Sequence, residues 1–403
     1  MKIGVFTESY LPDPNGIATT VAASARELEK MGHTVYIIAP SHPGYKDKKN
    51  VIRLYSFKMY RSLDMRTALH LPEKNLIKVL RLDLDIIHGH GGGSVSFLGW
   101  EIARLKNIQY IATYHTFAHE YTHYVLRGKV VTPAIVKTAT RIFGNMCEQL
   151  IAPTDRAKKV LRKLGVKTPI TILPNGIDRT LFEVKNKQFL REKLKITANK
   201  KILLYAGRLG QEKSVDFLLT SFVQIHKNNP NTVLVLVGDG PDKKALKKLA
   251  QKLNIQKQVY FTGFIKGHLM PSVYAGADLF VFASKTETQG MVLIEAMTSG
   301  LPVVAVYDKA FRDLIQNDYN GYLTKRSNID FAKTVTTLLA SYEKCAEMGM
   351  HAKESTIQFS LQKSTQDLEA LYKELYLIHK TRKDSPIRYT FRGAKKIIDI
   401  LST

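Results

Sequence analysis

The sequence predicts two α/β domains, each built on a doubly wound parallel sheet. Its 403 residues exceed one ordinary core, because domains usually contain about 100–200 residues. Short apolar runs alternate with helical patterns along most of the chain, as parallel strands with crossover helices require. The turn-rich segment LPNGIDRTLF (173–182) interrupts this alternation, which then starts again. The chain is therefore expected to divide near residue 183.

The first half opens with a strand–loop–helix–strand unit. KIGVFT (2–7) is a β-rich run, VAASARELEKMG has a helical pattern that ends at Gly32, and HTVYIIAP is the next strand. The elements expected after it are strand 84–90, a helical stretch to Lys106, strands 108–115 and 149–154, the helix DRAKKVLRKLG, and strand 169–174. This order predicts one parallel sheet covered by helices.

The second half repeats the pattern. Strands are expected at 201–209, 232–240, 258–264, 278–284 and 301–308, with helices between them. Residues 361–380 read as helical, and the basic segment 381–403 is expected to cross back and complete the first domain. The predicted domains are therefore 1–183 with 381–403, and 184–380. Ligands bind such sheets at the carboxyl ends of the strands, so two facing domains would form one site in an interdomain cleft.

The charge of the chain predicts an anionic partner. There are 60 Lys and Arg residues against 35 Asp and Glu residues, a net charge of +25. Nucleic acid, an anionic membrane or a phosphorylated substrate would suit this excess, and a solvated lysine-rich surface is the alternative. The sequence contains no run of about 18 apolar residues, the length that a helix needs to span a bilayer. The N-terminus does not resemble a signal peptide. Cys147 and Cys345 lie far apart and are expected to be reduced thiols, so we expect a cytoplasmic protein.

Three loops have residues suited to an anion. Gly16 stands just before a helix, where backbone amides can approach a ligand, although a plain strand–helix turn is an equal alternative. AGRLGQEKS (206–214) brings Arg208 and Lys213 to a strand end, and two fixed cations suit a diphosphate. The alternative interpretation is that Arg208 and Lys213 are solvated surface charges. Gly290 precedes the apolar helix MVLIEAMTS, whose positive end also suits a phosphate.

Two glutamates flank Gly290 and are expected to have different roles. Glu287 lies in the loop before the helix, whereas Glu295 lies about one turn or more inside it. Carboxylates accept hydrogen bonds from paired hydroxyls, such as those of a sugar or a ribose. The alternative, simple pairing with nearby lysines, fits Glu287 better than Glu295, whose neighbours in the sequence are apolar.

Two histidine-rich stretches resemble metal sites only superficially. HGHGGG (88–93) has His88 and His90 at a strand end, but no nearby carboxylate or cysteine completes a zinc set. We therefore expect a loop beside the cleft. HEYTH (119–123) has the spacing of a zinc-protease helix but lacks the third ligand and the further motif.

Taken together, these motifs resemble a known family. A glycine loop after the first strand, GRL…EK, GDGP, and E-x7-E ahead of EAM-x-x-G-x-P are similar, in this order, to the retaining nucleotide-sugar glycosyltransferases with two facing Rossmann-like domains, the GT-B fold. The resemblance covers roughly residues 1–325. TETQGMVLIEA has Thr-Gln-Gly where many relatives have a Phe-Gly pair. With YHTFAHEYTHYV, this stretch resembles the bacterial glucosyltransferases that act on diacylglycerol.

The resemblance implies a role for each matching residue of the donor site. Glu287 would contact the hydroxyls of the donor sugar and Glu295 the ribose. Arg208 and Lys213 would bind the diphosphate. The other positions that it implies are Gly16 near the phosphate, Thr288, Gln289 and Gly290 along the donor, Phe264 and Ile265 near the base, and His115 near the sugar and the reacting centre.

The resemblance also implies the reaction. The donor would be UDP-glucose, the acceptor 1,2-diacylglycerol, and the donor's own phosphate would help to deprotonate the acceptor on the face it leaves. No tightly bound cofactor and no metal site are expected, and magnesium would at most stimulate. Another acceptor is the alternative: a monoglycosyl lipid, a phosphatidylinositol-like lipid or a soluble sugar. A non-catalytic basic protein that binds a membrane or nucleic acid is a further alternative, although no nucleic-acid module is recognisable.

An apolar acceptor implies docking on the inner face of the cell membrane. Residues 57–81 mix apolar and basic side chains without clean periodicity, as in interfacial segments. The helix DRAKKVLRKLG could do the same, but an ordinary amphipathic surface helix is at least as good an interpretation. The residues expected at the membrane or the acceptor entrance are Lys58, Tyr60, Arg61, Arg66, Lys74, Lys78, Arg81, Tyr121 and His123.

Overall fold

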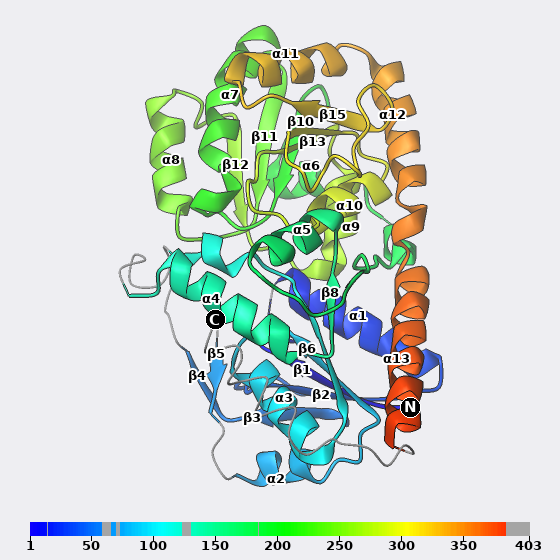
Figure 1. Cartoon of the computed structure of the whole chain (residues 1–403). Coiled ribbons are helices and arrows are strands. Elements are labelled where there is room, and N and C mark those ends of the chain that lie inside the picture. The colour runs from blue at the N-terminus through cyan, green and yellow to red at the C-terminus, as the bar shows by residue number, and fades with distance from the viewer. Residues whose placement is uncertain (14, 59–65, 70–72, 123–129, 184, 384–403) are drawn as a thin grey trace. The chain divides into compact units, whose positions relative to one another are not determined.

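Two parallel sheets organise the chain, one in each of two structural units (Figure 1). The structure is a computed structural model that describes residues 1–383 except 14, 59–65, 70–72, 123–129 and 184. Unit 1 comprises Met1–Gly176 and the segment from Leu361 onward, and unit 2 is Ile177–Ser360. The two doubly wound domains predicted from the sequence are thereby confirmed.

The sheet of unit 1 has seven strands within the described residues, all parallel, in the order β3-β2-β1-β6-β7-β8-β9. Their bounds are β1 Lys2–Thr7, β2 Thr34–Pro40, β3 Val51–Leu54, β6 Ile86–His90, β7 Gln109–Thr113, β8 Gln149–Ala152 and β9 Ile170–Ile172. A separate antiparallel pair is formed by β4 (Ser56–Lys58) and β5 (Arg66–Ala68). Most strands are buried on both faces, which explains why they read as apolar runs.

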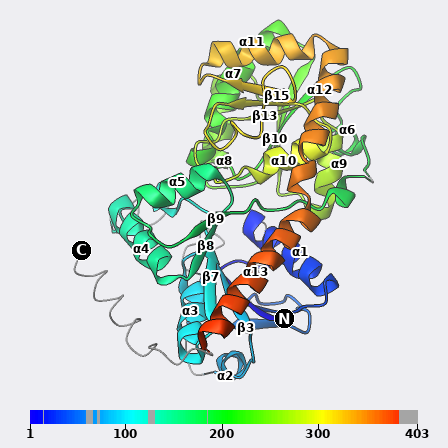
Figure 2. The same cartoon turned by 45° about the vertical axis from the view of Figure 1, so that its right-hand side comes forward.

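Helices cover both faces of this sheet. On one face, α1 (Gly16–Lys30) and α13 (Leu361–Lys383) share a core, and Figure 2 shows α13 lying beside α1. On the other face, α2 (Lys74–Leu80), α3 (Ser94–Lys106) and α5 (Asp155–Lys163) bury their apolar sides, and α4 (Pro133–Met146) packs Phe143 against them. The polar faces of these helices remain at the surface, as expected for helices that bury one side.

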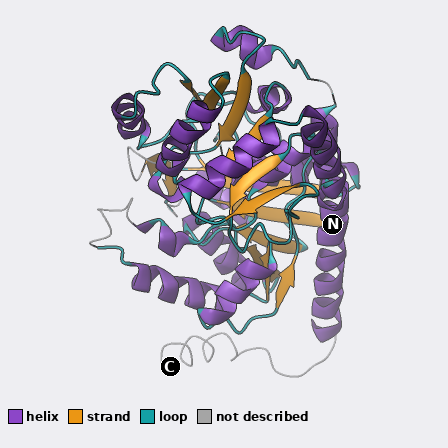
Figure 3. Ribbon diagram, turned by 90° about the horizontal axis from the view of Figure 1, so that it is seen from above, coloured by secondary structure: helices purple, strands orange, loops and turns teal. Residues whose placement is uncertain are grey.

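Unit 2 has the same architecture. Its six described strands are parallel, in the order β12-β11-β10-β13-β14-β15. The strands are β10 Lys201–Ala206, β11 Thr232–Val237, β12 Val259–Gly263, β13 Leu279–Phe282, β14 Val303–Val306 and β15 Gly321–Thr324. The helices are α6 Phe189–Leu194, α7 Val215–Asn228, α8 Lys243–Lys252, α9 Met270–Ala275, α10 Met291–Thr298, α11 Asn328–Leu339 and α12 Tyr342–Ser355. Helices and sheet enclose one apolar core, and Figure 3 shows strands flanked by helices.

The strand order of each sheet reverses at one point, which is where sheets of this kind bind ligands. In unit 1 the order reverses at β1 and β6, and in unit 2 at β10 and β13. Loops that follow two such strands diverge toward opposite faces, so a ligand can sit between them. The predicted loops after β10 and β13 therefore flank one point of unit 2.

The chain returns to unit 1 earlier than the sequence suggested. The expected boundaries at 183 and 381 lie at 176 and 361 in the structure. The reason is packing: Leu368, Leu371 and Tyr372 of α13 are buried in the core beneath α1. Of the expected crossing segment 381–403, residues 384–403 lie outside the described part of the chain.

Candidate active site

The loops after β10 and β13 form the candidate donor site in unit 2. β10 and β13 are hydrogen-bonded neighbours, with Leu203 opposite Leu279. After β10, Leu209 is buried and anchors the loop, whereas the side chain of Arg208 is exposed. The Tyr205 hydroxyl donates a hydrogen bond of 2.7 Å to the Arg208 carbonyl. The loop is thus fixed at its backbone while its guanidinium remains accessible.

Lys213 and Glu287 form an ion pair across these two loops. Lys213 Nζ lies 2.5 Å from Glu287 Oε1, and each side chain is 15% exposed. The sequence placed one residue on a diphosphate and the other on a sugar, or else in a simple ion pair. An ammonium has three donors and a carboxylate two acceptor oxygens, so each group can bond to more than one partner. The pair fixes both groups beside the strand ends.

Glycines of the GDG motif let two loops of unit 2 pack tightly. A Cβ on Gly238 would lie 1.9 Å from the Gly207 carbonyl oxygen, and one on Gly240 would lie 2.4 Å from that of Leu209. The Leu209 amide donates a bond of 3.0 Å to the Asp239 carbonyl. The motif therefore supports the backbone on either side of Arg208.

The helix α10 begins just after Gly290 and has no side-chain cap. Gly290 is the N-cap residue, has φ of 80° and is followed by a first turn with no acidic residue. That left-handed conformation favours glycine, and a Cβ there would also lie 2.9 Å from the Phe311 ring. Gln289 is buried and Thr288 half-buried just before it. Amides at such an uncapped positive helix end suit an anion.

Glu295 lies inside α10 and is held by a tyrosine. The Tyr274 hydroxyl, from α9, donates a bond of 2.6 Å to Glu295 Oε2. Burial raises the pKa of Glu295, and the bond from Tyr274 opposes that shift. Sequence reasoning missed Tyr274. Its signal in the sequence was a hydroxyl-bearing aromatic residue in a short, mostly apolar helix.

The two residues proposed beside the nucleotide base differ in exposure. Phe264, just after β12, has 58% of its surface exposed, so its ring is accessible. The side chain of Ile265 is packed in the core of unit 2. A ligand could therefore meet only the backbone of Ile265.

In unit 1, His115 follows β7 and contacts a second histidine. His115 Nε2 lies 2.8 Å from His90 Nδ1. Burial lowers the pKa of His115 to about 4, so this ring is neutral at pH 7. Gly16, the first residue of α1, is exposed, with open space around the position of a Cβ. The preceding Asn15 caps the helix through a bond of 3.0 Å from the Ala18 amide.

A carboxylate that sequence reasoning did not single out lies at the reversal point of unit 1. Glu8 follows β1, and its Oε1 accepts a bond of 2.9 Å from the Ser96 amide near the start of α3. Gly93 leaves room for this carboxylate, because a Cβ there would lie 2.5 Å from Glu8 Cδ. Burial raises the pKa of Glu8 to about 7, against the opposing hydrogen bonds from Ser96, Val95 and Ser94. The glycines after β6 thus accommodate a helix-capping glutamate.

The predicted membrane segment consists of several elements. Within 57–81 the structure describes β4, β5 and α2, and it exposes Lys74, Lys78 and Arg81 together with Ile77 and Leu80. Arg66 is instead half-buried and donates to the Ser56 carbonyl at 2.7 Å. Lys58 belongs to β4. Tyr60, Arg61 and His123 lie outside the described residues, and Tyr121 is half-buried.

The helix α5 agrees with its simpler interpretation. Ala157 and Leu161 are buried in the core of unit 1, whereas Lys159, Arg162 and Lys163 are exposed. This is the pattern of an amphipathic helix packed against its own domain.

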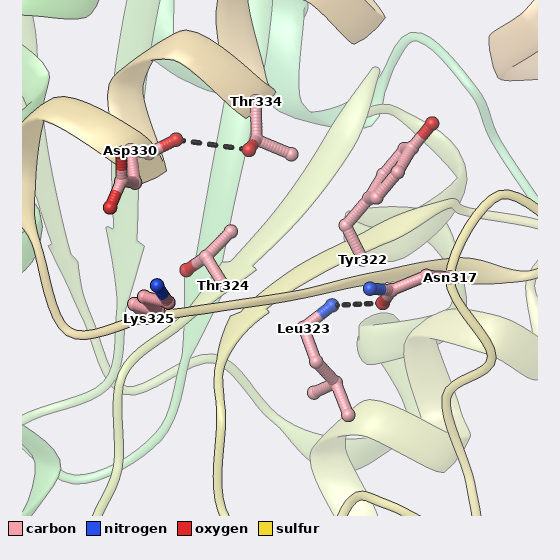
Figure 4. Close-up of a pocket in the computed structure, with 7 residues that line it drawn as sticks. All are labelled: Asn317, Tyr322, Leu323, Thr324, Lys325, Asp330 and Thr334. Carbon is pink, nitrogen blue, oxygen red and sulfur yellow. Dashed lines mark hydrogen bonds between the residues drawn. The ribbon is translucent and has the colours of Figure 1, made fainter.

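A pocket of about 330 Å³ lies elsewhere in unit 2, between β15 and α11 (Figure 4). Its lining contains none of the predicted donor-site residues. Polar groups there are bonded locally: the Leu323 amide donates to Asn317 Oδ1, and the Thr334 hydroxyl donates to the Asp330 carbonyl. This pocket is therefore separate from the candidate donor site at the reversal point between β10 and β13.

Across the described ranges, no group of three or more His, Cys, Asp or Glu side chains is arranged to hold a metal ion. None of the helices described there is both long and apolar enough to cross a membrane.

The two doubly wound sheets, together with the family models that match the two halves of the chain, define a glycosyltransferase of the GT-B fold. Residues 14–181 match the family described as Glycosyltransferase Family 4, and residues 186–355 match Glycosyl transferases group 1. The fold is also that of sucrose-phosphate synthase from Thermosynechococcus elongatus, with a TM-score of 0.78 at 20% identity over 94% of this chain and 99% of that one. HepE from Anabaena, solved with UDP-glucose, matches with a TM-score of 0.74 at 19% identity over 93% and 100% of the two chains.

The chain belongs to the family of the alpha-monoglucosyldiacylglycerol synthases. It is 31% identical to the synthase of this name from Acholeplasma laidlawii over 398 residues, which cover 95% of this chain and 99% of the relative. It is 35% identical to the synthase of the same name from Streptococcus pneumoniae over 331 residues, or 80% and 75% of the two chains. The protein is therefore an enzyme that transfers hexoses. The resemblance predicted from the sequence is confirmed, and the non-catalytic alternatives are set aside.

Proposed function

We propose that the enzyme transfers glucose from UDP-glucose to the free hydroxyl of 1,2-diacylglycerol and retains the anomeric configuration. The product would be an α-monoglucosyldiacylglycerol. The observation that carries this proposal is the similarity to the Acholeplasma laidlawii synthase over 99% of that protein. An acceptor of this kind is apolar except for its hydroxyl, so the reaction would take place at a membrane surface.

The donor would bind at the reversal point of unit 2. Arg208, Lys213 and the amides at the start of α10 present positive charge there, which suits a diphosphate. The solved complex of HepE with UDP-glucose supports a nucleotide sugar as the ligand of this fold. The remaining roles are Glu287 on the sugar hydroxyls, Glu295 on the ribose, Phe264 and the Ile265 backbone on the base, Thr288, Gln289 and Gly290 along the donor, and Gly16 near the phosphate.

The chemistry follows from these charges. The acceptor oxygen forms a bond to the anomeric carbon while the bond from that carbon to the diphosphate breaks on the same face. The bonding electrons leave with the diphosphate, and the acceptor proton passes to a departing phosphate oxygen. Arg208 and Lys213 stabilise the charge that develops, and a preorganised donor of this kind contributes about 3–4 kcal/mol in comparable sites.

His115 would act as a neutral hydrogen-bonding group. Its lowered pKa means that the ring carries one proton at pH 7, so it can donate from one nitrogen and accept at the other. A hydroxyl of the donor sugar is the partner we assign to it. It would orient the sugar and would not protonate the leaving group.

The enzyme would reach its acceptor by docking on an anionic surface. The exposed cations Lys74, Lys78 and Arg81 lie beside the exposed apolar side chains of Ile77 and Leu80. Such a combination suits the boundary between headgroups and acyl chains. Each cation would contribute about 1 kcal/mol at an anionic surface, so the protein would be peripheral on the inner face of the cell membrane.

A donor-by-acceptor screen tests the proposal. The purified protein is incubated with UDP-glucose, UDP-galactose or GDP-mannose and with vesicles containing diacylglycerol, monoglucosyldiacylglycerol or phosphatidylinositol. We expect transfer only from UDP-glucose to diacylglycerol, without added metal and with at most stimulation by magnesium. Transfer to another lipid, or from GDP-mannose, would replace the acceptor or donor of this proposal.

A further inference from the structure

Two buried histidines, His88 and His90, and the half-buried His115 form a cluster at the ends of β6 and β7 in unit 1. His90 Nδ1 lies 2.8 Å from His115 Nε2, and the two rings are stacked with centroids 5.1 Å apart and planes 17° apart. The ring of His88 lies 4.0 Å from that of His90. His88 and His90 are 1% and 7% exposed. The His-Gly-His stretch that the sequence left without a function therefore lies against the histidine proposed to meet the sugar.

His88 is the fixed member of this cluster. Its Nδ1 lies 2.6 Å from the Tyr372 hydroxyl of α13, and its Nε2 lies 2.7 Å from the Thr113 hydroxyl of β7. Both ring nitrogens are thus bonded, and rotation of the ring would break both bonds. Because the His88 ring packs on His90, the bond from Tyr372 connects α13 to the whole histidine cluster.

The glycine between the two histidines is required by packing. A Cβ on Gly89 would lie 2.0 Å from the hydroxyl of Tyr110, which donates a bond of 2.9 Å to the Ser96 carbonyl. The spacing of His88 and His90 on either side of Gly89 places them on the same side of β6. Both can therefore contact one another and the residue that follows β7.

The bond between His90 and His115 links their protonation. Burial lowers the pKa of all three histidines, so each ring carries a single N–H at neutral pH. In the bond between His90 Nδ1 and His115 Nε2, one nitrogen must donate and the other accept. The nitrogen that carries the proton of His90 therefore decides which nitrogen carries the proton of His115, and the bond also fixes the ring.

We propose that His90 is a positioning residue that sets the orientation and the tautomer of His115 for glycosyl transfer. His88, held by Tyr372 and Thr113, would keep His90 in place. The proposal rests on the proposed function, in which His115 bonds to a hydroxyl of the donor sugar. A neutral imidazole can donate to, or accept from, this hydroxyl only if its proton lies on the nitrogen that the direction of the bond requires.

Two substitutions of His90 separate a hydrogen bond from mere packing. His90→Phe retains an aromatic ring for stacking but removes Nδ1. His90→Asn places an amide near the position of Nδ1 and keeps the bond to His115. His379→Asn is the matched control, because His379 of α13 bonds to Gln109 and the Asn107 carbonyl at another part of the sheet.

The first readout is the tautomer of His115, measured by NMR on protein labelled with ¹⁵N at its histidine rings and assigned with His115→Gln. We expect one tautomer in the wild type, in His90→Asn and in the control. In His90→Phe we expect a mixture, or the opposite tautomer. An unchanged His115 signal in His90→Phe would overturn the proposal.

The second readout is the kinetics of glucosyl transfer. We expect kcat of His90→Phe to fall about 10- to 100-fold, as small misplacements of a catalytic group do, while KM for the donor changes less than about twofold. His90→Asn should recover most of this loss. A shifted tautomer with wild-type kcat would also overturn the proposal, because His115 would then not need to be positioned.

Two further outcomes are distinguished: His90→Phe does not fold, or the wild type transfers no glucose to diacylglycerol. If His90→Phe does not fold, Tyr372→Phe takes its place, since it removes one of the bonds that hold His88 and should shift the His115 signal in the same direction. If the wild type transfers no glucose to diacylglycerol, the proposed function fails. The proposal about His90 is then tested by two measurements: the tautomer of His115, and kcat with the donor and acceptor that the enzyme does use.

Discussion

The ion pair between Lys213 and Glu287 is the part of the donor site that lends itself best to a quantitative prediction. We consider Glu287→Gln, Lys213→Met and the double substitution. The two charges are 2.5 Å apart, and each side chain is 15% exposed. A fully exposed pair contributes about 0–1 kcal/mol, and breaking a fully buried pair costs about 3–5 kcal/mol. At this intermediate exposure we expect about 2 kcal/mol for each single substitution.

The expected thermal effect follows from the size of the domain. In a domain of this size, 1 kcal/mol shifts the melting temperature by roughly 2–4 °C, so each single variant should melt roughly 4–8 °C lower. The double variant should be no less stable than either single variant, because it leaves no unpaired charge. Activity should behave differently. Each single substitution should lower kcat by about two to three powers of ten, and the double variant should remain inactive.

The assays are thermal unfolding and the rate of lipid glucosylation. The matched control is Lys363→Met, which breaks the exposed pair with Asp367 on α13; it should change the melting temperature by less than about 2 °C and leave kcat unchanged. Additive losses of stability in the double variant would show that the two charges do not stabilise one another. Wild-type kcat in both single variants would show that the donor's sugar and diphosphate bind elsewhere.

The remaining predictions concern the ribose, a buried carboxylate and the membrane. Glu295→Gln and Tyr274→Phe should weaken UDP binding in calorimetry with little change in kcat; intact UDP affinity in both would remove Glu295 from the ribose. Because the folded pKa of Glu8 is raised from 4.5 to about 7, its contribution to stability is present below pH 4.5 and is lost as the pH rises through 7. As the pH rises from 4.5 to 8, the free energy of unfolding of Glu8→Gln, measured in urea titrations, should therefore increase relative to that of the wild type by up to about 3 kcal/mol. Parallel pH profiles of the two proteins would contradict that pKa. Neutralising Lys74, Lys78 and Arg81 to Gln should weaken binding to anionic vesicles by about 3 kcal/mol at low salt, whereas equal binding of wild type and variant would move the docking surface elsewhere.

The sequence predicted the strands whose burial is complete, and it also predicted β9 and β12, which are only partly buried. Strands such as β10 and β11 are buried on both faces, so they appear as unbroken apolar runs. β15, in which two of the four residues are buried, was not predicted. β3 was not predicted either, since it contains Arg53, whose guanidinium is paired with Asp47 at 2.8 Å. A charge neutralised by tertiary structure conceals a strand from pattern analysis.

The candidate site was predictable where its residues follow strands in sequence motifs. Arg208, Lys213, Glu287 and Gly290 were proposed in this way, since loops at strand ends carry the ligands of such sheets. Contacts between distant segments were not predictable. Tyr372 and His88 are separated by 284 positions, and no local pattern connects Glu8 with the start of α3. Only the folded chain brings these distant residues into contact.

The central claim is that this enzyme joins glucose to diacylglycerol with retention, and the product itself tests it most directly. The purified protein is incubated with UDP-[¹³C]glucose and anionic vesicles that contain 1,2-diacylglycerol, and the lipid fraction is analysed by mass spectrometry and NMR. The account predicts glucosyldiacylglycerol with an α-anomeric signal, formed in equal amount with UDP. A β-anomeric product, or release of UDP without a glycosylated lipid, would contradict it.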